Sequence, residues 1–345
     1  MRSLILIFYI LTLSACSNKD VEPLENNDPS KYNLAKDVLW ASPNSFDLTM
    51  DIYTPTSGKD AYPVLLIFHG GGWLINDKSI MDQASSYLAT NSEYVICNVN
   101  YRLLADQDNT VTIDQIVGDA FGAVLWVKAH IGVYGGDANK VAVTGDSAGA
   151  HLAAMIVNSG HQLGSDAYSE LSPLFIPSYL QDGITAEVVA EQRGLSVQAA
   201  ILSYGAFDLY SPDMRDIESW KNPFWLVAGS LARGLFGDDF HAEDNPIMYQ
   251  GVSPIYNIPA IEELVLPPQL LTVGSDDPLV SPASVSAYLA KLQNAGHSAQ
   301  YWEYEGRSHA FLDSGSNALL ASSFEKDAPV ALDIMIDFLD EVFYQ

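Results

Sequence analysis

The chain has 345 residues, 48% hydrophobic and 17% charged, a composition that excludes a disordered, collagen-like or coiled-coil protein. Its 16 Lys and Arg residues against 43 Asp and Glu residues give a net charge of −27, so nucleic acid is not an expected partner, because no excess of cations exists to replace phosphate counterions. At this length we expect one large domain, and the sequence leaves the oligomeric state open.

The first residues have the pattern of an export signal. Arg2 precedes an apolar run over residues 4–13, which is too short to span a bilayer but has the length of a signal-peptide core. The run leads into Leu-Ser-Ala-Cys16, which resembles the lipobox of bacterial lipoproteins, where the cysteine becomes lipidated. We therefore expect residues 1–16 to be a lipoprotein signal peptide and Cys16 to anchor an exported protein to a membrane, on the periplasmic or the cell-surface side. A plain secretory signal with a chance cysteine is the alternative.

The sequence after the signal divides into a tether and a folded domain. Residues 17–35 are polar and predict a flexible tether, whereas residues 36–345 alternate strand and helix patterns. Expected strands are 46–53, 63–68, 94–100, 140–144, 198–203, 269–273 and 300–304, and expected helices are 113–131, 148–159, 282–295 and 327–343. The alternating pattern of residues 46–53 indicates an outer strand with one wet face, while the continuous apolar runs indicate fully buried strands. This order predicts an α/β fold with a mostly parallel central sheet and helices on both faces.

Two connections are much longer than the usual loop between a strand and a helix. Residues 160–196 and 207–262 are both rich in aromatic side chains. Insertions of this size usually cover a site, so we expect both to form a cap or lid, with peripheral packing as the alternative.

Ser147 lies in a Gly-x-Ser-x-Gly motif, residues 145–149, between an expected strand and an expected helix. That context is the one a nucleophilic serine requires, because the tight turn exposes the serine oxygen at a helix N-terminus. Free N–H groups and the helix dipole favour negative charge there. We expect Asp146, beside the serine, to hydrogen-bond within the turn and not to transfer protons.

A second motif, His-Gly-Gly-Gly-Trp at residues 69–73, follows a buried strand. Three successive glycines leave backbone N–H groups accessible to the carbonyl oxygen of a substrate. This loop predicts an oxyanion hole near the serine.

Together with Asn-Tyr-Arg-Leu at residues 100–103 and Gly-Gly-Asp at 135–137, these motifs resemble the α/β-hydrolase superfamily. More narrowly, they resemble its esterase and lipase group with an HGGG oxyanion loop, related to hormone-sensitive lipase and bacterial carboxylesterases. The resemblance covers about residues 46–343 and implies an α/β-hydrolase fold with a cap. It also implies an oxyanion hole formed by the N–H groups of Gly71, Gly72 and Ala148, with the first residue of the loop, His69, in a structural role.

A nucleophilic serine in this fold needs an acid and then a base later in the chain. His309 follows the last expected strand, where this fold places its base, and Asp277 follows the strand before it. Asp277 precedes Pro-Leu as in the family's Asp-Pro-Leu position, and Asp276 is the alternative. We expect Asp277 to hold the His309 imidazole in one tautomer while Ser147 gives up its proton.

Three other reactive side chains are expected to be structural. Cys97 lies in an apolar strand and is expected to be an inert core thiol. His151 falls one helical turn after Ser147 and precedes the expected acid, so it is expected to be a helix residue. His297 lies in a polar helix-to-strand turn and is expected at the solvated surface.

These residues predict a serine carboxylic-ester hydrolase that acts through an acyl-enzyme and needs no metal and no cofactor. Export and family resemblance together favour short-chain acyl (acetyl) or feruloyl esters of extracellular glycans or small molecules. One alternative is an amidase or peptidase on the same fold, similar to arylformamidase or prolyl oligopeptidase. Another is a binding module that has lost catalysis.

Overall fold

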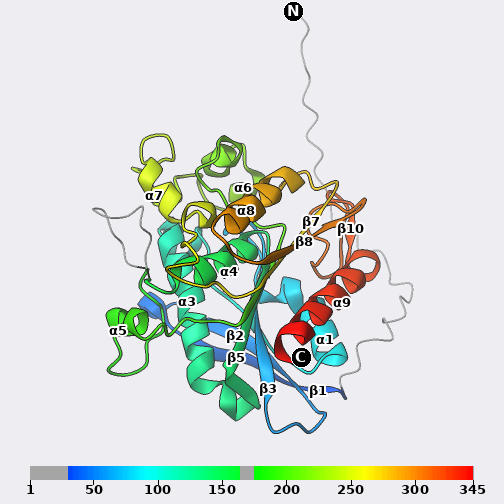
Figure 1. Ribbon diagram of the computed structural model, residues 1–345. Helices are drawn as coiled ribbons and strands as arrows, with labels where there is room; N and C mark the ends of the chain where they lie inside the picture. Colours follow the sequence, from blue (N-terminus) through cyan, green and yellow to red (C-terminus); the bar gives the residue numbers. More distant parts are fainter. Residues whose placement is uncertain (1–29, 164–174, 345) are drawn as a thin grey trace, which may run out of the picture.

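The computed structural model describes residues 30–163 and 175–344, so the expected signal peptide, Cys16 and most of the expected tether lie outside the described residues (Figure 1). Strand β1 spans Tyr32–Ala41 and pairs antiparallel with β2, Leu48–Pro55. The last four residues assigned to the tether, 32–35, are therefore part of the sheet. Because β1 covers its edge, β2 is buried over most of its length and is not the outer strand that the sequence predicts.

Eight of the ten described strands form one mixed sheet in the order β1-β2-β4-β3-β5-β6-β7-β8, while β9 (Ser316–Asn317) and β10 (Ser322–Ser323) pair antiparallel in a separate hairpin. Pairing is parallel from β4 to β8 and antiparallel at β1 and β2. The remaining strands are β3 (Tyr62–Phe68), β4 (Val95–Val99), β5 (Gly136–Asp146), β6 (Ala199–Ser203), β7 (Gln269–Gly274) and β8 (Ala299–Tyr304). This is the mostly parallel sheet expected from the sequence, and all residues of β3, β4, β6 and β7 are buried.

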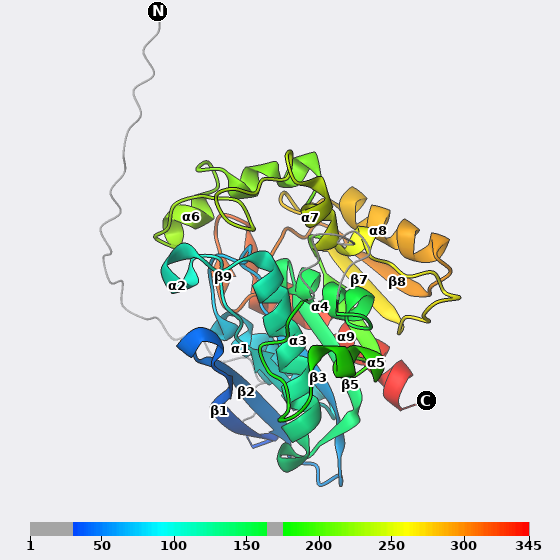
Figure 2. The same ribbon diagram turned by 90° about the vertical axis from the view of Figure 1, so that its left-hand side faces the viewer.

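Helices cover both faces of the sheet (Figures 1 and 2). Helices α1 (Asp82–Asn91) and α9 (Phe324–Phe343) pack together on one face, and α3 (Ile113–His130), α4 (Ala148–Ser159) and α8 (Pro282–Asn294) cover the other. A capping box of Thr112 and Gln115 begins α3. By length and hydropathy α3 could span a membrane, but 67% of its most apolar window is buried inside the protein, as in a core helix.

The two long insertions occupy different places. The first is described at residues 160–163 and 175–196, and its longer part, residues 175–196, packs on the outer side of α3 and includes α5, Ala186–Glu191 (Figure 2). Two glycines of α3 allow this close approach. A Cβ on Gly118 would lie 2.4 Å from the Ile176 carbonyl oxygen, and a Cβ on Gly122 would lie 2.7 Å from the backbone nitrogen of Tyr179. The described part of this insertion therefore covers a helix and forms no cap, contrary to the prediction.

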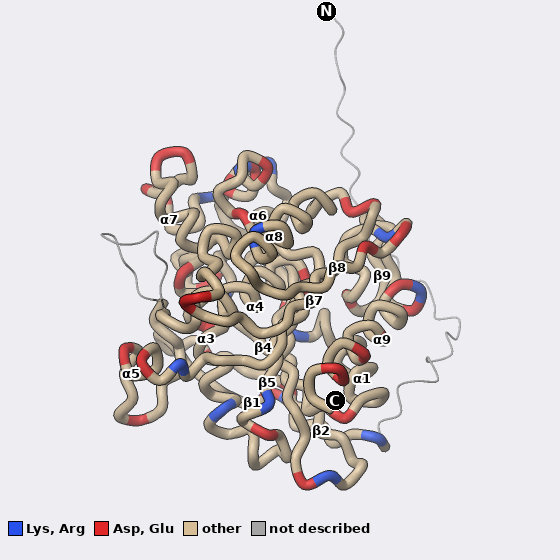
Figure 3. Tube along the Cα trace, in the orientation of Figure 1, with Lys and Arg blue, Asp and Glu red and all other residues tan. Residues whose placement is uncertain are grey.

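The second insertion, residues 207–262, contains α6 (Pro223–Val227) and α7 (Pro246–Gly251), which lie together at one end of the molecule (Figure 2). A Cβ on Gly72 would lie 2.9 Å from Cδ2 of Phe224, so α6 lies directly against the glycine loop. This insertion therefore takes the position of the expected cap. Acidic residues dominate the loop next to α7, and the described Lys and Arg residues are few and scattered along the chain (Figure 3).

Candidate active site

Ser147 lies in a strained turn between β5 and α4. Its φ and ψ of 51° and −115° fall in a region that residues with a Cβ rarely adopt, and its N–H donates to the Ser203 carbonyl at 2.9 Å. Close packing imposes the turn, since a Cβ on Gly149 would lie 1.9 Å from the Phe68 carbonyl oxygen. The serine hydroxyl is consequently held above the N-terminus of α4.

Ser147, His309 and Asp277 form a continuous hydrogen-bond chain. The Ser147 hydroxyl lies 2.9 Å from His309 Nε2, and His309 Nδ1 lies 2.7 Å from Asp277 Oδ2. The three side chains follow β5, β8 and β7, and parallel strands bring their carboxyl ends to the same edge of the sheet. The structure thus brings together all three residues that the sequence singled out as nucleophile, base and acid.

Local hydrogen bonds explain why Asp277, and not its neighbour Asp276, faces the histidine. The backbone N–H groups of Leu279 and Val280 both donate to Asp277 Oδ1 at 2.8 Å, which orients the second oxygen toward the imidazole. Asp276 is exposed and its carboxylate accepts from the Ser275 hydroxyl. The Asp-Pro-Leu turn therefore orients the carboxylate of Asp277 and not that of Asp276.

The His309 imidazole is enclosed. It is 5% exposed, and the ring of the fully buried Tyr204 meets it edge-on with 4.7 Å between the ring centres. The Tyr204 hydroxyl accepts the Leu312 N–H at 3.2 Å, which ties the tyrosine to the loop that carries the histidine. This enclosure limits the imidazole to the orientation in which it joins Ser147 and Asp277.

The glycine loop presents free N–H groups beside the serine. Gly71 and Gly72 have φ of +117° and +60°, which favour glycine, and the Gly71 carbonyl closes a turn by accepting the N–H groups of Leu74 and Ile75 at 3.1 Å. Among the described residues, the N–H groups of Gly71, Gly72 and Ala148 donate no hydrogen bond to another protein group. They are available to an oxyanion, as the resemblance implies.

His69 supports this loop and is not placed to act as a base. Its Nδ1 lies 2.8 Å from the Gly70 carbonyl, and its ring stacks on Tyr101 with 4.3 Å between centres. The Tyr101 hydroxyl in turn donates to the His69 carbonyl at 2.6 Å. Burial lowers the pKa of His69 to about 4, so the ring is neutral at physiological pH. The structural position expected for His69 is the one observed.

Of the three other reactive side chains, Cys97 and His151 lie as expected, whereas the prediction for His297 is wrong. Cys97 is buried in β4, and burial raises the pKa of its thiol, which makes it inert. His151 is buried in α4, where its Nε2 donates to the Val252 carbonyl at 2.7 Å. His297, expected at the surface, is only 5% exposed, because its Nε2 donates to the Pro259 carbonyl at 2.7 Å in a segment distant in sequence.

Sequence reasoning missed three residues around the site. Phe224 of the cap borders the oxyanion loop, Tyr204 encloses the base, and Asp313 hydrogen-bonds with Asp146. None belongs to a recognisable motif. For Asp313 the one available signal was a carboxylate four residues after the base in an apolar segment.

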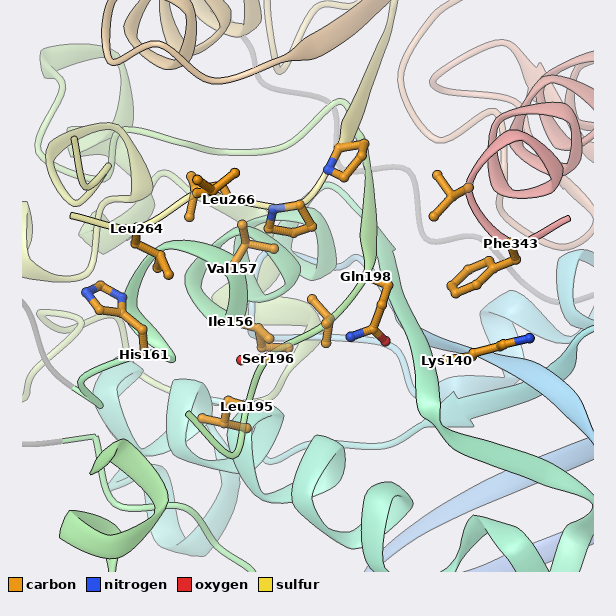
Figure 4. A pocket seen from close by; sticks show the side chains of 15 residues that line it. Lys140, Ile156, Val157, His161, Leu195, Ser196, Gln198, Leu264, Leu266 and Phe343 are labelled. Carbon is orange, nitrogen blue, oxygen red and sulfur yellow. The ribbon is translucent and has the colours of Figure 1, made fainter. Parts of the chain in front are cut away.

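A cavity of about 570 Å³ lies at the opposite end of the sheet from Ser147, and Figure 4 shows the side chains that line it. It is lined by Lys140 in the first half of β5, by Gln198 just before β6 and by apolar residues that include Ile156, Leu195 and Leu264. It contains none of the residues that the sequence singled out for chemistry. We therefore place the candidate active site at the carboxyl ends of the strands.

Comparisons with known proteins agree with this arrangement. Residues 50–292, more than half of the chain, match the family model BD-FAE. The chain is 29% identical over 252 residues to Esterase LipQ of Mycobacterium tuberculosis, covering 72% of this chain and 50% of that protein. It is 25% identical over 292 residues to probable isoprenylcysteine alpha-carbonyl methylesterase ICMEL1 of Arabidopsis thaliana, covering 82% and 53%. The chain thus spans about half the length of these curated relatives.

Among solved structures, the apo form of Thermogutta terrifontis esterase 2 is similar with a TM-score of 0.62 and 23% identity, covering 92% of this chain and 97% of that one. This likeness shows the fold, the α/β-hydrolase fold that the sequence predicts. The match over residues 50–292 shows that the chain, which has this fold, belongs to the BD-FAE family.

Proposed function

We propose that the protein is a serine carboxylic-ester hydrolase. The observation that carries the proposal is the Ser147–His309–Asp277 hydrogen-bond chain, with distances of 2.9 and 2.7 Å, beside unpaired backbone N–H groups. A nucleophile, its base, the acid that orients the base, and an oxyanion site are the parts that acyl transfer requires. Their joint presence is also the reason to disfavour a binding module that has lost catalysis.

The geometry defines the steps of the proposed cycle. Ser147 Oγ attacks the ester carbonyl carbon while its proton passes to His309 Nε2, and the N–H groups of Gly71, Gly72 and Ala148 receive the negative oxygen. The intermediate collapses, Nε2 returns the proton to the leaving alkoxide, and an acyl-enzyme with the free alcohol results. Water, deprotonated by the same nitrogen, then attacks the acyl carbon; the bond to Ser147 Oγ breaks, Nε2 returns the proton to Oγ, and the carboxylic acid is released. Throughout, Asp277 accepts the Nδ1–H and stabilises the imidazolium.

We infer that short acyl groups are preferred. Phe224 closes one side of the oxyanion loop, where not even one added carbon on Gly72 would fit without displacing the ring. The neighbour Thermogutta terrifontis esterase 2 has been solved with propionate bound, and another of its structures is phosphorylated by paraoxon. Acetyl and feruloyl esters of extracellular glycans or small molecules are the substrates we propose for this chain.

A substrate panel tests the proposal. We expect the protein to hydrolyse p-nitrophenyl acetate faster than the butyrate and palmitate esters and to act on a methyl ferulate ester, with Ser147→Ala inactive on all of them. A palmitate ester as the fastest substrate would contradict the chain-length preference. An aminoacyl anilide turned over faster than every ester would favour the amidase alternative, and no hydrolysis of any of these compounds would contradict the enzyme assignment.

We also propose that the chain is exported and anchored to a membrane through a lipid on Cys16, on the basis of the residues before it. Expression of the full chain in a bacterium with an alkyne-tagged palmitate should label the protein and place it in the membrane fraction. The Cys16→Ser variant should lose the label. Labelling that survives this substitution, or an unlabelled wild type in the soluble fraction, would contradict the anchor.

A further inference from the structure

Two carboxyl groups lie directly behind the catalytic residues. Asp146 precedes Ser147 and is 1% exposed, and Asp313 belongs to the loop that follows His309. Their side chains hydrogen-bond with each other. In both residues Oδ1 is buried and has no hydrogen-bond partner of its own among the described protein groups.

Two ionised carboxylates cannot remain in hydrogen-bond contact in a buried place without donors, because like charges at this distance repel strongly. A proton between them removes the repulsion and supplies the missing donor. The surroundings indicate which residue holds it. The backbone N–H groups of Gly70 and of Asp146 itself donate to the Asp146 carboxyl, which also interacts with His309, whereas among the described residues only Asp146 hydrogen-bonds the Asp313 carboxyl.

Electrostatics agrees with this assignment. Burial and the neighbouring charge of Asp146 raise the pKa of Asp313 well above its ordinary value. Burial also raises the pKa of Asp146, to about 6, although His309 and the Gly70 N–H act in the opposite direction. At neutral pH the pair therefore carries one negative charge, located on Asp146.

We propose that Asp313 is a neutral carboxylic acid that donates to the Asp146 carboxylate, and that this pair positions the catalytic residues by joining three loops. Asp146 belongs to the turn of Ser147, Gly70 to the oxyanion loop and Asp313 to the loop of His309. One carboxylate thus connects the nucleophile, the oxyanion site and the base. The inference rests on the proposed function, and it adds two positioning residues to it.

The pair can exchange its proton with solvent. Asp313 lines a cavity of about 340 Å³ together with Ile80 and residues of the β9–β10 hairpin, including the exposed Leu319. The titratable groups that face the pair from the packed elements are His309, Tyr101 and Tyr204; Asp277 faces Tyr204. Both tyrosines stay neutral because burial raises their pKa well above the ordinary value.

Loss of the proton from Asp313 to hydroxide leaves two adjacent carboxylates. Their repulsion should separate the loops of Ser147 and His309, so kcat should fall at alkaline pH. In Asp313→Asn the amide N–H donates permanently, and from neutral to alkaline pH the charge of the pair no longer changes, because Asp146 is already ionised. We expect this variant to keep kcat at pH 7 within about threefold and to lose the alkaline fall, whereas Asp313→Leu, which leaves Asp146 without its donor, should lose at least about tenfold in kcat with little change in KM.

The experiment measures kcat and KM on p-nitrophenyl acetate from pH 5 to 10 for the wild type, Asp313→Asn and Asp313→Leu, with circular dichroism to verify folding. Asp276→Asn, at an exposed acid of a neighbouring turn, is the matched control and should follow the wild-type profile. An alkaline limb that is the same in the wild type and in Asp313→Asn would overturn the positioning role. If Asp313→Leu does not fold, the Asn variant alone decides.

A second measurement tests the proton without using activity. The infrared spectrum of the wild type at pH 7, minus that of Asp313→Asn, should contain the carbonyl stretch of a protonated carboxylic acid, and its absence would overturn the shared proton. A wild type that shows this band but hydrolyses no ester would contradict the proposed function and leave the acid–carboxylate pair standing. The infrared band and the hydrolysis assay thereby distinguish failure of the acid–carboxylate pair from failure of the proposed esterase activity.

Discussion

The two ends of the central sheet differ in what they hold. At the carboxyl ends of β5, β7 and β8, a hydroxyl, an imidazole and a carboxylate are joined by hydrogen bonds of 2.9 and 2.7 Å. At the amino ends lies a cavity of about 570 Å³ with mainly apolar walls. The comparison teaches that converging polar groups, held by strained turns, locate the candidate chemistry in this fold better than the volume of a cavity does.

At the carboxyl ends of the strands, the largest expected loss of activity after removal of Ser147 comes from replacing the carboxylate of Asp277. Asp277→Asn keeps the size of the side chain but cannot fix the imidazole tautomer, so kcat should fall by roughly 10⁴-fold. Hydrolysis of p-nitrophenyl acetate measures it, with Asp276→Asn as the control that should remain active. Equal activity losses in the two variants would show that the observed hydrogen bond does not distinguish these neighbours.

The oxyanion loop should give the next largest effect. Gly72→Ala forces an unfavourable φ and places a methyl group 2.9 Å from Phe224, so we expect kcat to fall roughly 10²- to 10³-fold with KM changed little. Adding Phe224→Leu should restore part of the loss by relieving the contact with the cap. A Gly72→Ala enzyme with normal kcat would contradict the place assigned to this loop.

A buried histidine near the same end should make stability depend on pH. Burial lowers the pKa of His151 to about 4, so between pH 6.5 and pH 4 the unfolded chain binds a proton that the folded state does not. The contribution of His151 to the free energy of unfolding is therefore complete above pH 6.5. It declines as the pH falls, by up to about 3 kcal/mol at pH 4. Urea unfolding of wild type and His151→Gln should show a shallower decline in the variant, and parallel curves would contradict the assignment.

The smallest effect is expected at the amino end. Leu264→Ala enlarges the cavity and should lower the free energy of unfolding by roughly 1–3 kcal/mol, because the side chain is partly buried. Its kcat/KM on acetyl and feruloyl esters should equal that of the wild type. A selective loss on one ester would show that the cavity binds substrate and would remove the contrast between the two ends.

The sequence predicts those parts of the molecule in which a local residue pattern specifies both the backbone conformation and the reactive side chain. The mostly parallel sheet follows from the alternation of strand and helix patterns, and the meeting of Ser147, His309 and Asp277 follows from motifs whose residues have specific backbone requirements. Helix α1 could not be predicted from the sequence, because DQASSYLATN has no continuous apolar stripe although most of its residues are buried.

Long-range packing accounts for the remaining differences. Residues 175–196 lie on α3 because two helix glycines admit them, and His297 is buried by a carbonyl 38 residues away. Asp146 accepts its own backbone N–H within the turn, as expected, and in addition joins Gly70 and Asp313 on two other loops. In each case the partner lies far along the chain, where no sequence spacing identifies it.

The most direct test of the central claim is covalent labelling of the nucleophile. Paraoxon added in slight excess to the folded protein should place one diethylphosphoryl group on Ser147, found by peptide mass spectrometry, and should abolish ester hydrolysis in proportion to the label. His309→Asn should react far more slowly although Ser147 is present. Label spread over several side chains, or a fully active enzyme after Ser147 has been labelled, would contradict the account.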